Sequence, residues 1–285
     1  MKKIIVVSLL IGVVFCLRTI KPLMGEETKT EKQEKKVGKL GKTVPELIDL
    51  LKTGKESSKG FYILDLGFSK DERALVPLVD ILLKDKNPRN RKEAAMALEY
   101  LGNKQAVIYL QEALKDKDER VQIYSAKALT RLGELKYSIK ILKDLAKEGY
   151  AEAIDAFIID YTTGTQKEKG RKLIDKKANN ILIEALNYEN EWVRIKSAFI
   201  LSEVGKIELG KVSAEIIALC KKSLEESKDK WIKYFAADIL GNIRTDDSVS
   251  ILKKCLNDKD TDLVERATKS LKKIGYNSTK ELKEN

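Results

Sequence analysis

The chain has 285 residues, of which 43% are apolar, 35% are charged and only 6% are aromatic, and its four prolines are few enough to favour helices throughout. It contains no histidine, so the commonest general base and the commonest metal ligand are both excluded. The formal net charge of +11 would suit an anionic partner, but lysine-rich exposed helices give the same value without one.

Residues 1–25 have the pattern of a secretory signal. Lys2 and Lys3 form a positive n-region, and residues 4–17 form an apolar h-region too short to span a bilayer comfortably. Cleavage after Gly25 would remove four basic residues and no acidic ones, which lowers the net charge from +11 to +7. The segment predicts export to the periplasm or cell envelope of a bacterium.

Cys16 gives the same segment an alternative role. The run Val13-Val14-Phe15-Cys16 resembles a lipobox, in which the cysteine is lipidated, but Phe15 stands where a small residue is usual. We therefore expect a soluble exported protein, with a lipid anchor at Cys16 as the alternative. Contact with a membrane is expected only in the lipidated form.

Residues 26–42 carry both charge signs and almost no apolar side chains. Such a segment cannot bury enough surface to offset the entropy of ordering it, so it predicts a flexible tether. Thr43 then combines with Pro45 and Glu46 as an N-cap, an early proline and an acid in the first turn. The first helix is expected to begin there.

A repeat of about 31 residues organises the rest of the chain. The second half of residues 71–133 matches the first half, and Gly102, Gly133 and Gly164 stand 31 residues apart. Later units are longer, with 41 residues from Gly164 to Gly205. A fixed period of this length is typical of a solenoid.

Each unit has the pattern of two helices. A leucine-rich first helix leads into a polar turn, such as KDKN at 84–87 or KDKD at 115–118, and the second helix carries small residues that permit close packing. The pattern predicts about seven helix pairs over residues 43–276, followed by a charged tail at 277–285.

The unit resembles the HEAT-like repeat, in the short form also found in phycobilisome lyases. The residues that carry the resemblance are a Val-Arg step, a helix of small residues and a final glycine, as in Trp192-Val193-Arg194 with Ala198 and Gly205, in Val121 with Ala126, Leu129 and Gly133, and in the first-helix run Ala74–Leu78. The resemblance implies an all-α fold, a right-handed α-solenoid of about seven HEAT-like helix pairs. Two departures, Tyr161–Gly164 and Arg244 in a glycine position, predict distorted layers.

Two motifs that suggest ligand binding are incomplete. Residues 205–211 satisfy GxxxxGK, but Val212 replaces the Ser or Thr that would hold magnesium, and the run joins helices instead of following a strand. The alternating aspartates from Asp258 lack the glycine and the final glutamate of a calcium loop. We expect no metal and no cofactor.

Cys220 and Cys255 occupy apolar positions of adjacent first helices. Stacked helices lie about 8–10 Å apart, beyond easy disulfide reach, so we expect two buried free thiols.

The best functional candidate is a surface formed by the first turns of the second helices, which the resemblance places on a concave face. Aromatic rings beside cations suit the recognition of a protein or another anionic polymer. The candidate binding residues are Arg89, Arg91, Lys92, Arg120, Gln122, Trp192, Arg194, Lys196, Trp231, Lys233 and Tyr234. The alternative is that the two tryptophans pack between repeats and the arginines pair with turn aspartates.

The predicted function is an exported HEAT-repeat scaffold that presents this surface to a protein partner in the cell envelope, without catalysis. One alternative is a nucleic-acid binder or a DNA-glycosylase-like enzyme, which the signal segment and the modest mature charge disfavour. The other is a lyase-type accessory subunit that acts on a bound protein.

Overall fold

The computed structural model describes residues 35–160, 171–173, 176–204 and 210–276. The chain divides into two units, Met1–Lys36 and Val37–Asn285, and the described residues fall almost wholly in the second. The expected signal segment with Cys16 and the charged tail at 277–285 lie outside the described residues, so export and lipidation stay predictions. Within the described ranges, no helix combines the length and the apolar character needed to cross a bilayer.

The second unit begins with a small turn, where a flexible tether was expected. Val37 and Lys42 form an antiparallel bridge, in which the Val37 N–H donates to the Lys42 carbonyl at 2.7 Å. The carboxylate of Asp65 accepts from the N–H groups of Lys39 at 3.0 Å and Leu40 at 2.8 Å. The last residues of the expected tether are therefore folded, because a buried carboxylate binds their backbone.

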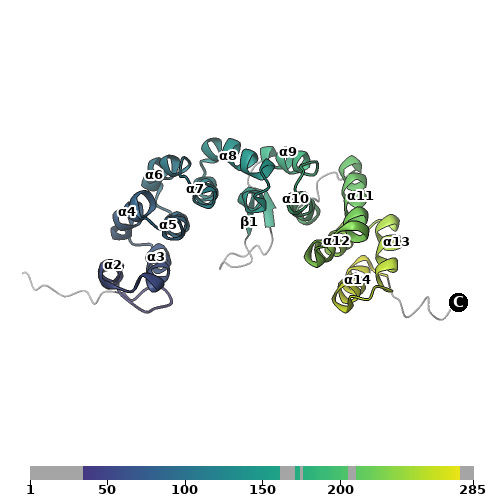
Figure 1. Cartoon of the computed structure of the whole chain (residues 1–285), viewed down its shortest axis with the longest axis horizontal. Helices are drawn as coiled ribbons and strands as arrows, with labels where there is room; N and C mark the ends of the chain where they lie inside the picture. The colour runs from purple at the N-terminus through teal and green to yellow at the C-terminus, as the bar shows by residue number, and fades with distance from the viewer. Residues whose placement is uncertain (1–34, 161–170, 174–175, 205–209, 277–285) are drawn as a thin grey trace, which may run out of the picture. The chain divides into compact units, whose positions relative to one another are not determined.

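The helices form the expected pairs (Figure 1). The first helices are α2 (Val44–Thr53), α4 (Leu75–Lys84), α6 (Val107–Ala113), α8 (Leu135–Lys147), α9 (Lys176–Ala185), α11 (Gly210–Glu226) and α13 (Asp246–Cys255). The second helices are α3 (Lys59–Phe68), α5 (Pro88–Leu101), α7 (Glu119–Arg131), α10 (Glu191–Val204), α12 (Lys230–Ile243) and α14 (Thr261–Ile274). Short 3-10 turns lie at η1 (Glu56–Ser58), η2 (Glu72–Ala74) and η3 (Lys104–Ala106).

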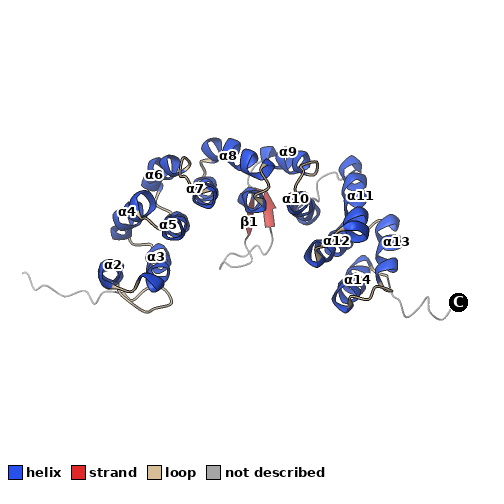
Figure 2. Cartoon of the chain, viewed as in Figure 1, coloured by secondary structure: helices blue, strands red, loops and turns tan. Residues whose placement is uncertain are grey.

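The fourth pair departs from the others near the point where the sequence breaks its pattern. Its second element is the 3-10 helix η4 (Ala151–Phe157), which runs into strand β1 (Ile158–Asp160). Strand β1 pairs with β2 (Arg171–Leu173), and the two strands are red in Figure 2. The pairing is antiparallel, with Ile158 opposite Leu173. η4 still contacts α7, α8 and α10, so the stack continues through it. We call α3, α5, α7, η4, α10, α12 and α14 the second-helix row.

Turn chemistry sets the helix ends. Asn87, Asp118, Asp229 and Asp260 each accept a hydrogen bond from the N–H two residues later, which caps a second helix. At the other end, Gly102 and Gly275 take up left-handed conformations. Arg244 adopts the same conformation at φ 60°, and its N–H bonds to the Leu240 carbonyl. Helix α12 therefore ends as its glycine-capped counterparts do, and the expected distortion at Arg244 is absent from this helix end.

Packing along the second-helix row is close because small residues line its contacts. Gly67 of α3 lies against the backbone of Ala97 in α5, and Gly241 of α12 lies against Ser270 in α14. The row is continuous, since α3 packs on α5, α5 on α7, α7 and α10 on η4, α10 on α12, and α12 on α14. These contacts confirm the α-solenoid that the repeat predicts.

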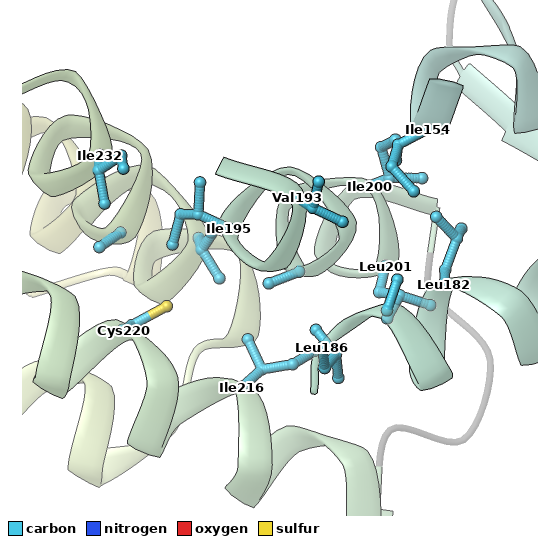
Figure 3. Packing of buried hydrophobic residues seen from close by; sticks show 14 of the residues in the cluster. Ile154, Leu182, Leu186, Val193, Ile195, Ile200, Leu201, Ile216, Cys220 and Ile232 are labelled. Carbon is cyan, nitrogen blue, oxygen red and sulfur yellow. The ribbon is translucent and has the colours of Figure 1, made fainter. Parts of the chain in front are cut away.

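The apolar core fills the space between the two rows of helices. Figure 3 shows one part of it, where Ile195 of α10 and Ile216 and Cys220 of α11 lie in the same cluster. Cys220 and Cys255 are both buried and free, which confirms the expected thiols. Burial raises the pKa of both thiols.

A second cluster of buried side chains serves the N-terminal pairs. Helix α7 belongs to both clusters: Val121 and Leu129 pack in the N-terminal one, whereas Ile123 and Ala126 pack in the C-terminal one.

Candidate binding surface

Arg91, predicted as a binding residue, is buried instead. Its Nε and Nη2 atoms each donate to a different carboxylate oxygen of Asp116 at 2.7 Å, and Nη1 donates to the Asp85 carbonyl at 2.9 Å. Burial favours the neutral form of Asp116, but the hydrogen bonds from Arg91 outweigh it and hold the pKa of Asp116 below its ordinary value. Arg91 therefore joins the turns of two adjacent layers and is unavailable to a partner.

Two more predicted residues occupy the same place in their helices, four positions after the capping residue. Gln122 donates through Nε2 to the Asp116 carbonyl at 2.6 Å. Arg194 donates through Nη1 to the carbonyls of Tyr188 at 2.8 Å and Glu189 at 2.5 Å. Both side chains fold back onto the turn that precedes their helix, which gives them a structural role that the sequence pattern did not reveal.

Other predicted cations remain at the surface. Arg89 is exposed and pairs with Glu93, with Nε 3.0 Å from Oε1. Arg120 is exposed, and Lys233 is half-buried.

Lys92 and Lys196 contact groups on neighbouring elements of the row. The Nζ atom of Lys92 lies 5.4 Å from the ring centroid of Tyr124, and Lys127 approaches the same ring at 5.7 Å. Lys196 pairs with Asp155 of η4 at 2.7 Å. Tyr124 was not among the predicted residues.

Trp192 packs between layers, as the alternative interpretation expected. Its indole Nε1 donates to Oδ2 of Asp229 at 3.0 Å. Its ring meets Phe235 of α12 edge to face, with centroids 5.8 Å apart, and Phe235 in turn meets Phe199 at 5.1 Å. The indole of Trp192 therefore ties α10 to α12.

Trp231 is 52% exposed, and it forms one wall of a cleft of about 300 Å³ between α12 and α14. Its ring meets Tyr234 edge to face, with centroids 5.5 Å apart. Tyr234 is buried and donates to Asp260 at 2.8 Å, and burial together with this hydrogen bond raises the pKa of Tyr234 to about 12. The cleft is lined by Trp231, Tyr234, Asp238, Asp262, Glu265, Arg266 and Lys269.

Some charged side chains around this cleft form an ion pair with each other, and others have no ion-pair partner among the residues that the structure describes. Arg266 lies 5.0 Å from the ring centroid of Tyr234 and pairs with Asp238 at 2.6 Å, so these two charges neutralise each other. Burial raises the pKa of Asp238 although Arg266 opposes it. Asp262 and Glu265 are exposed, and neither forms an ion pair with another residue in the described part of the chain.

Aromatic side chains are also exposed at the N-terminal end of the second-helix row. Phe61 is 64% and Phe68 46% exposed on α3, and the half-buried Leu64 lies between them at helical spacing. Phe68 stacks on Tyr100 of α5, with centroids 4.5 Å apart. The repeat pattern did not indicate this patch because the first pair matches the repeat poorly, but the spacing of its apolar residues could have revealed it.

A sequence-family model described as HEAT repeats matches residues 75–158 and 217–284. None of the curated proteins matches the chain.

Several solved structures are similar in fold. An archaeal HEAT-like repeats protein from Thermococcus onnurineus NA1 is 14% identical, with 82% of this chain and 97% of that chain covered and a TM-score of 0.48. The complex of CpcE and CpcF of phycocyanin lyase from Nostoc sp. PCC7120 is 18% identical, with 82% and 95% covered and a TM-score of 0.43. Human deoxyhypusine hydroxylase is 17% identical, with 82% and 85% covered and a TM-score of 0.32.

Proposed function

This chain belongs to the HEAT-repeat family, and we propose that it is an exported, non-catalytic scaffold that binds a protein partner in the cell envelope through its second-helix row. The export part of the proposal rests on the signal-like pattern of residues 1–25. The binding part rests on the side chains that the row leaves open to solvent.

The observation that carries the proposal is the exposure of aromatic rings on the row. Phe61, Phe68 and Trp231 are 64%, 46% and 52% exposed, whereas the buried core is almost entirely aliphatic. Large exposed aromatic side chains are costly to leave in water and are enriched among the residues that dominate protein interfaces. A protein surface would cover these rings.

The cations of the row favour a protein over a nucleic acid. Arg91 pairs with Asp116, Arg194 donates to turn carbonyls, and Lys196 pairs with Asp155. Nucleic-acid binding draws most of its affinity from cations that neutralise phosphates. Three of the seven predicted cations are therefore already held by bonds within the protein.

Site-specific photo-crosslinking in native cells would test the binding part. A benzophenone amino acid would replace Phe61 or Lys269 on the second-helix row, with the exposed Ile108 of α6 as the control on the first-helix row. We expect the same partner protein to be captured from Phe61 and Lys269 and not from Ile108. Capture only from Ile108 would place the interface on the other row and overturn the proposal.

The mass of the N-terminus of the protein recovered from fractionated cells would test export. A chain that starts at Glu26 in a soluble envelope fraction supports simple export, and an acylated Cys16 supports the anchored form. An intact Met1 on protein from the cytosol would overturn this part of the proposal.

A further inference from the structure

The two tryptophans of the chain occupy the same position in successive repeats, yet only one is covered. Trp192 is followed after 39 residues by Trp231, and each opens a second helix directly after its capping turn. The next layer supplies Trp192 with two partners, Asp229 for the indole N–H and Phe235 for the ring. The repeat therefore has a built-in place for a tryptophan between its layers.

The layer after Trp231 offers no such partners. The counterpart of Asp229 is Asp260, which accepts from the Tyr234 hydroxyl, and the counterpart of Phe235 is Arg266, which pairs with Asp238. Among the described residues, the Trp231 indole N–H donates no hydrogen bond, and the ring meets only Tyr234 of its own helix and Lys230. The indole is left half-exposed, with an unused donor, at the edge of a cleft.

The residues that line the cleft beside this indole carry a net negative charge, with three carboxylates against two cations. Asp262 and Glu265 on α14 line it, and the described chain provides no ion-pair partner for either carboxylate. Lys269 lines the same cleft and offsets part of this charge, whereas Arg266 is already neutralised by Asp238. The carboxylate of Asp262 accepts a hydrogen bond from the Tyr234 hydroxyl at 3.3 Å but has no cation paired with it in the described ranges. An aromatic face next to carboxylates without an ion-pair partner is the environment that a cationic side chain prefers.

A cation can reach this ring. The Nζ atom of Lys230, from the chain itself, lies 5.5 Å from the centroid of the Trp231 ring. Lys230 precedes Trp231 directly; it acts on the carboxylate of Asp260 but pairs with neither Asp262 nor Glu265 in the described structure. A ligand cation that also reaches Asp262 and Glu265 would gain charge pairing that Lys230 does not have.

We propose that the cleft between α12 and α14 binds a lysine or arginine side chain from an extended segment of the partner protein. The alkyl stem and the charge lie against the Trp231 ring, the carboxylates of Asp262 and Glu265 pair with the charge, and the free indole N–H donates to a carbonyl of the segment. This inference rests on the proposed function, since it states which chemistry the partner brings to one end of the second-helix row.

The two tryptophans make the test direct, because each gives one indole N–H signal in a 15N-labelled protein. The probes are Nα-acetyl-arginine amide, the neutral Nα-acetyl-glutamine amide and the anionic Nα-acetyl-glutamate amide, each titrated into the full chain. Trp231→Phe identifies the two signals by removing one. We expect the arginine probe to shift the Trp231 signal with a Kd on the order of millimolar, as a single side chain would give, and to leave the Trp192 signal in place.

Matched variants separate the local carboxylates from the overall charge. Asp262→Asn with Glu265→Gln should weaken the arginine probe about two- to twentyfold. Asp246→Asn with Asp247→Asn changes the net charge equally on exposed residues of α13 and should leave the Kd unchanged. Lys230→Ala removes the cation near the ring and should strengthen binding.

The inference is overturned if the arginine probe leaves the Trp231 signal unmoved, if it shifts both tryptophans equally, or if the glutamate probe shifts Trp231 as strongly. Crosslinking from Phe61 and Lys269 that persists in any of these cases would mean that the row binds a partner through other chemistry. If the arginine probe binds at Trp231 but no protein is crosslinked from Phe61 and Lys269, the cleft binds cationic side chains and the proposed protein partner is wrong.

Discussion

Arg91 and Asp116 form a bidentate ion pair that joins two adjacent layers of the solenoid, with both donor–acceptor distances at 2.7 Å. Both side chains are nearly buried, so removal of the arginine would leave a carboxylate without its cation in a poorly solvated place. We expect Arg91→Ala to lower the free energy of unfolding by about 3 kcal/mol, measured by urea denaturation.

The matched control is Arg120→Ala, in the first turn of the next second helix. Arg120 is exposed, and its side chain forms no ion pair within the described residues, so a loss below about 1 kcal/mol is expected. Equal losses at the two positions would contradict the structural role assigned to Arg91.

Asp116 also makes the stability of the protein depend on pH. Its native pKa lies below the ordinary value of 3.8 because the bonds from Arg91 outweigh burial. Its contribution to stability is therefore fully present above pH 3.8 and is lost as the pH falls through the lower native pKa. Urea midpoints measured from pH 6 to pH 2.5 should fall less steeply in Asp116→Asn than in the native chain, and parallel curves would contradict this assignment.

Gly38 holds the N-terminal turn against Asp65, and a side chain there would overlap the carboxylate. Gly38 and Gly41 both have positive φ, but only Gly38 faces another group, so Gly41→Ala reports the cost of the backbone conformation by itself. We expect Gly38→Ala to speed hydrogen exchange at the amides of Lys39 and Leu40 much more than Gly41→Ala does. Similar exchange in the two variants would show that the contact with Asp65 contributes nothing.

Because Cys220 and Cys255 are buried, we expect their thiols to react slowly with thiol reagents in the folded protein. Burial raises the pKa of Cys220 and Cys255, so little thiolate forms near neutral pH and access is blocked. In a Cys16→Ser variant, a disulfide reagent at pH 8 should react slowly with the native chain and rapidly with two thiols in urea. Rapid reaction without urea would contradict their burial.

The helix pairs could be predicted from the sequence because the capping residues and polar turns that define them interact within a single repeat. Asp118 and Asp229 cap helices at the positions that local turn chemistry indicates, whereas the left-handed helix end at Arg244 stands where the sequence predicted a distortion. These interactions span only a few residues, so the repeat period and the polar turns suffice to locate them.

The sequence left the roles of the surface residues open between partner binding and packing, because these roles depend on the next layer. Arg89 and Arg91 differ by two positions in one helix, and only the place of Asp116, 25 residues after Arg91, decides which of them is buried. Trp192 and Trp231 share a motif and differ only in what faces them. The repeat pattern is the same at both positions, so it does not show whether the next layer covers a side chain or leaves it exposed.

Helix α7 has a consequence for how the protein folds. It supplies Val121 and Leu129 to one core cluster and Ile123 and Ala126 to the other. Each cluster therefore loses packing contacts when α7 unfolds. In a linear array of repeats, each unit contacts only its neighbours, so unfolding is cooperative only through elements that neighbouring clusters share. The melting of the N-terminal pairs is thereby thermodynamically coupled to that of the C-terminal pairs, and damage to this one helix would turn a single transition into two.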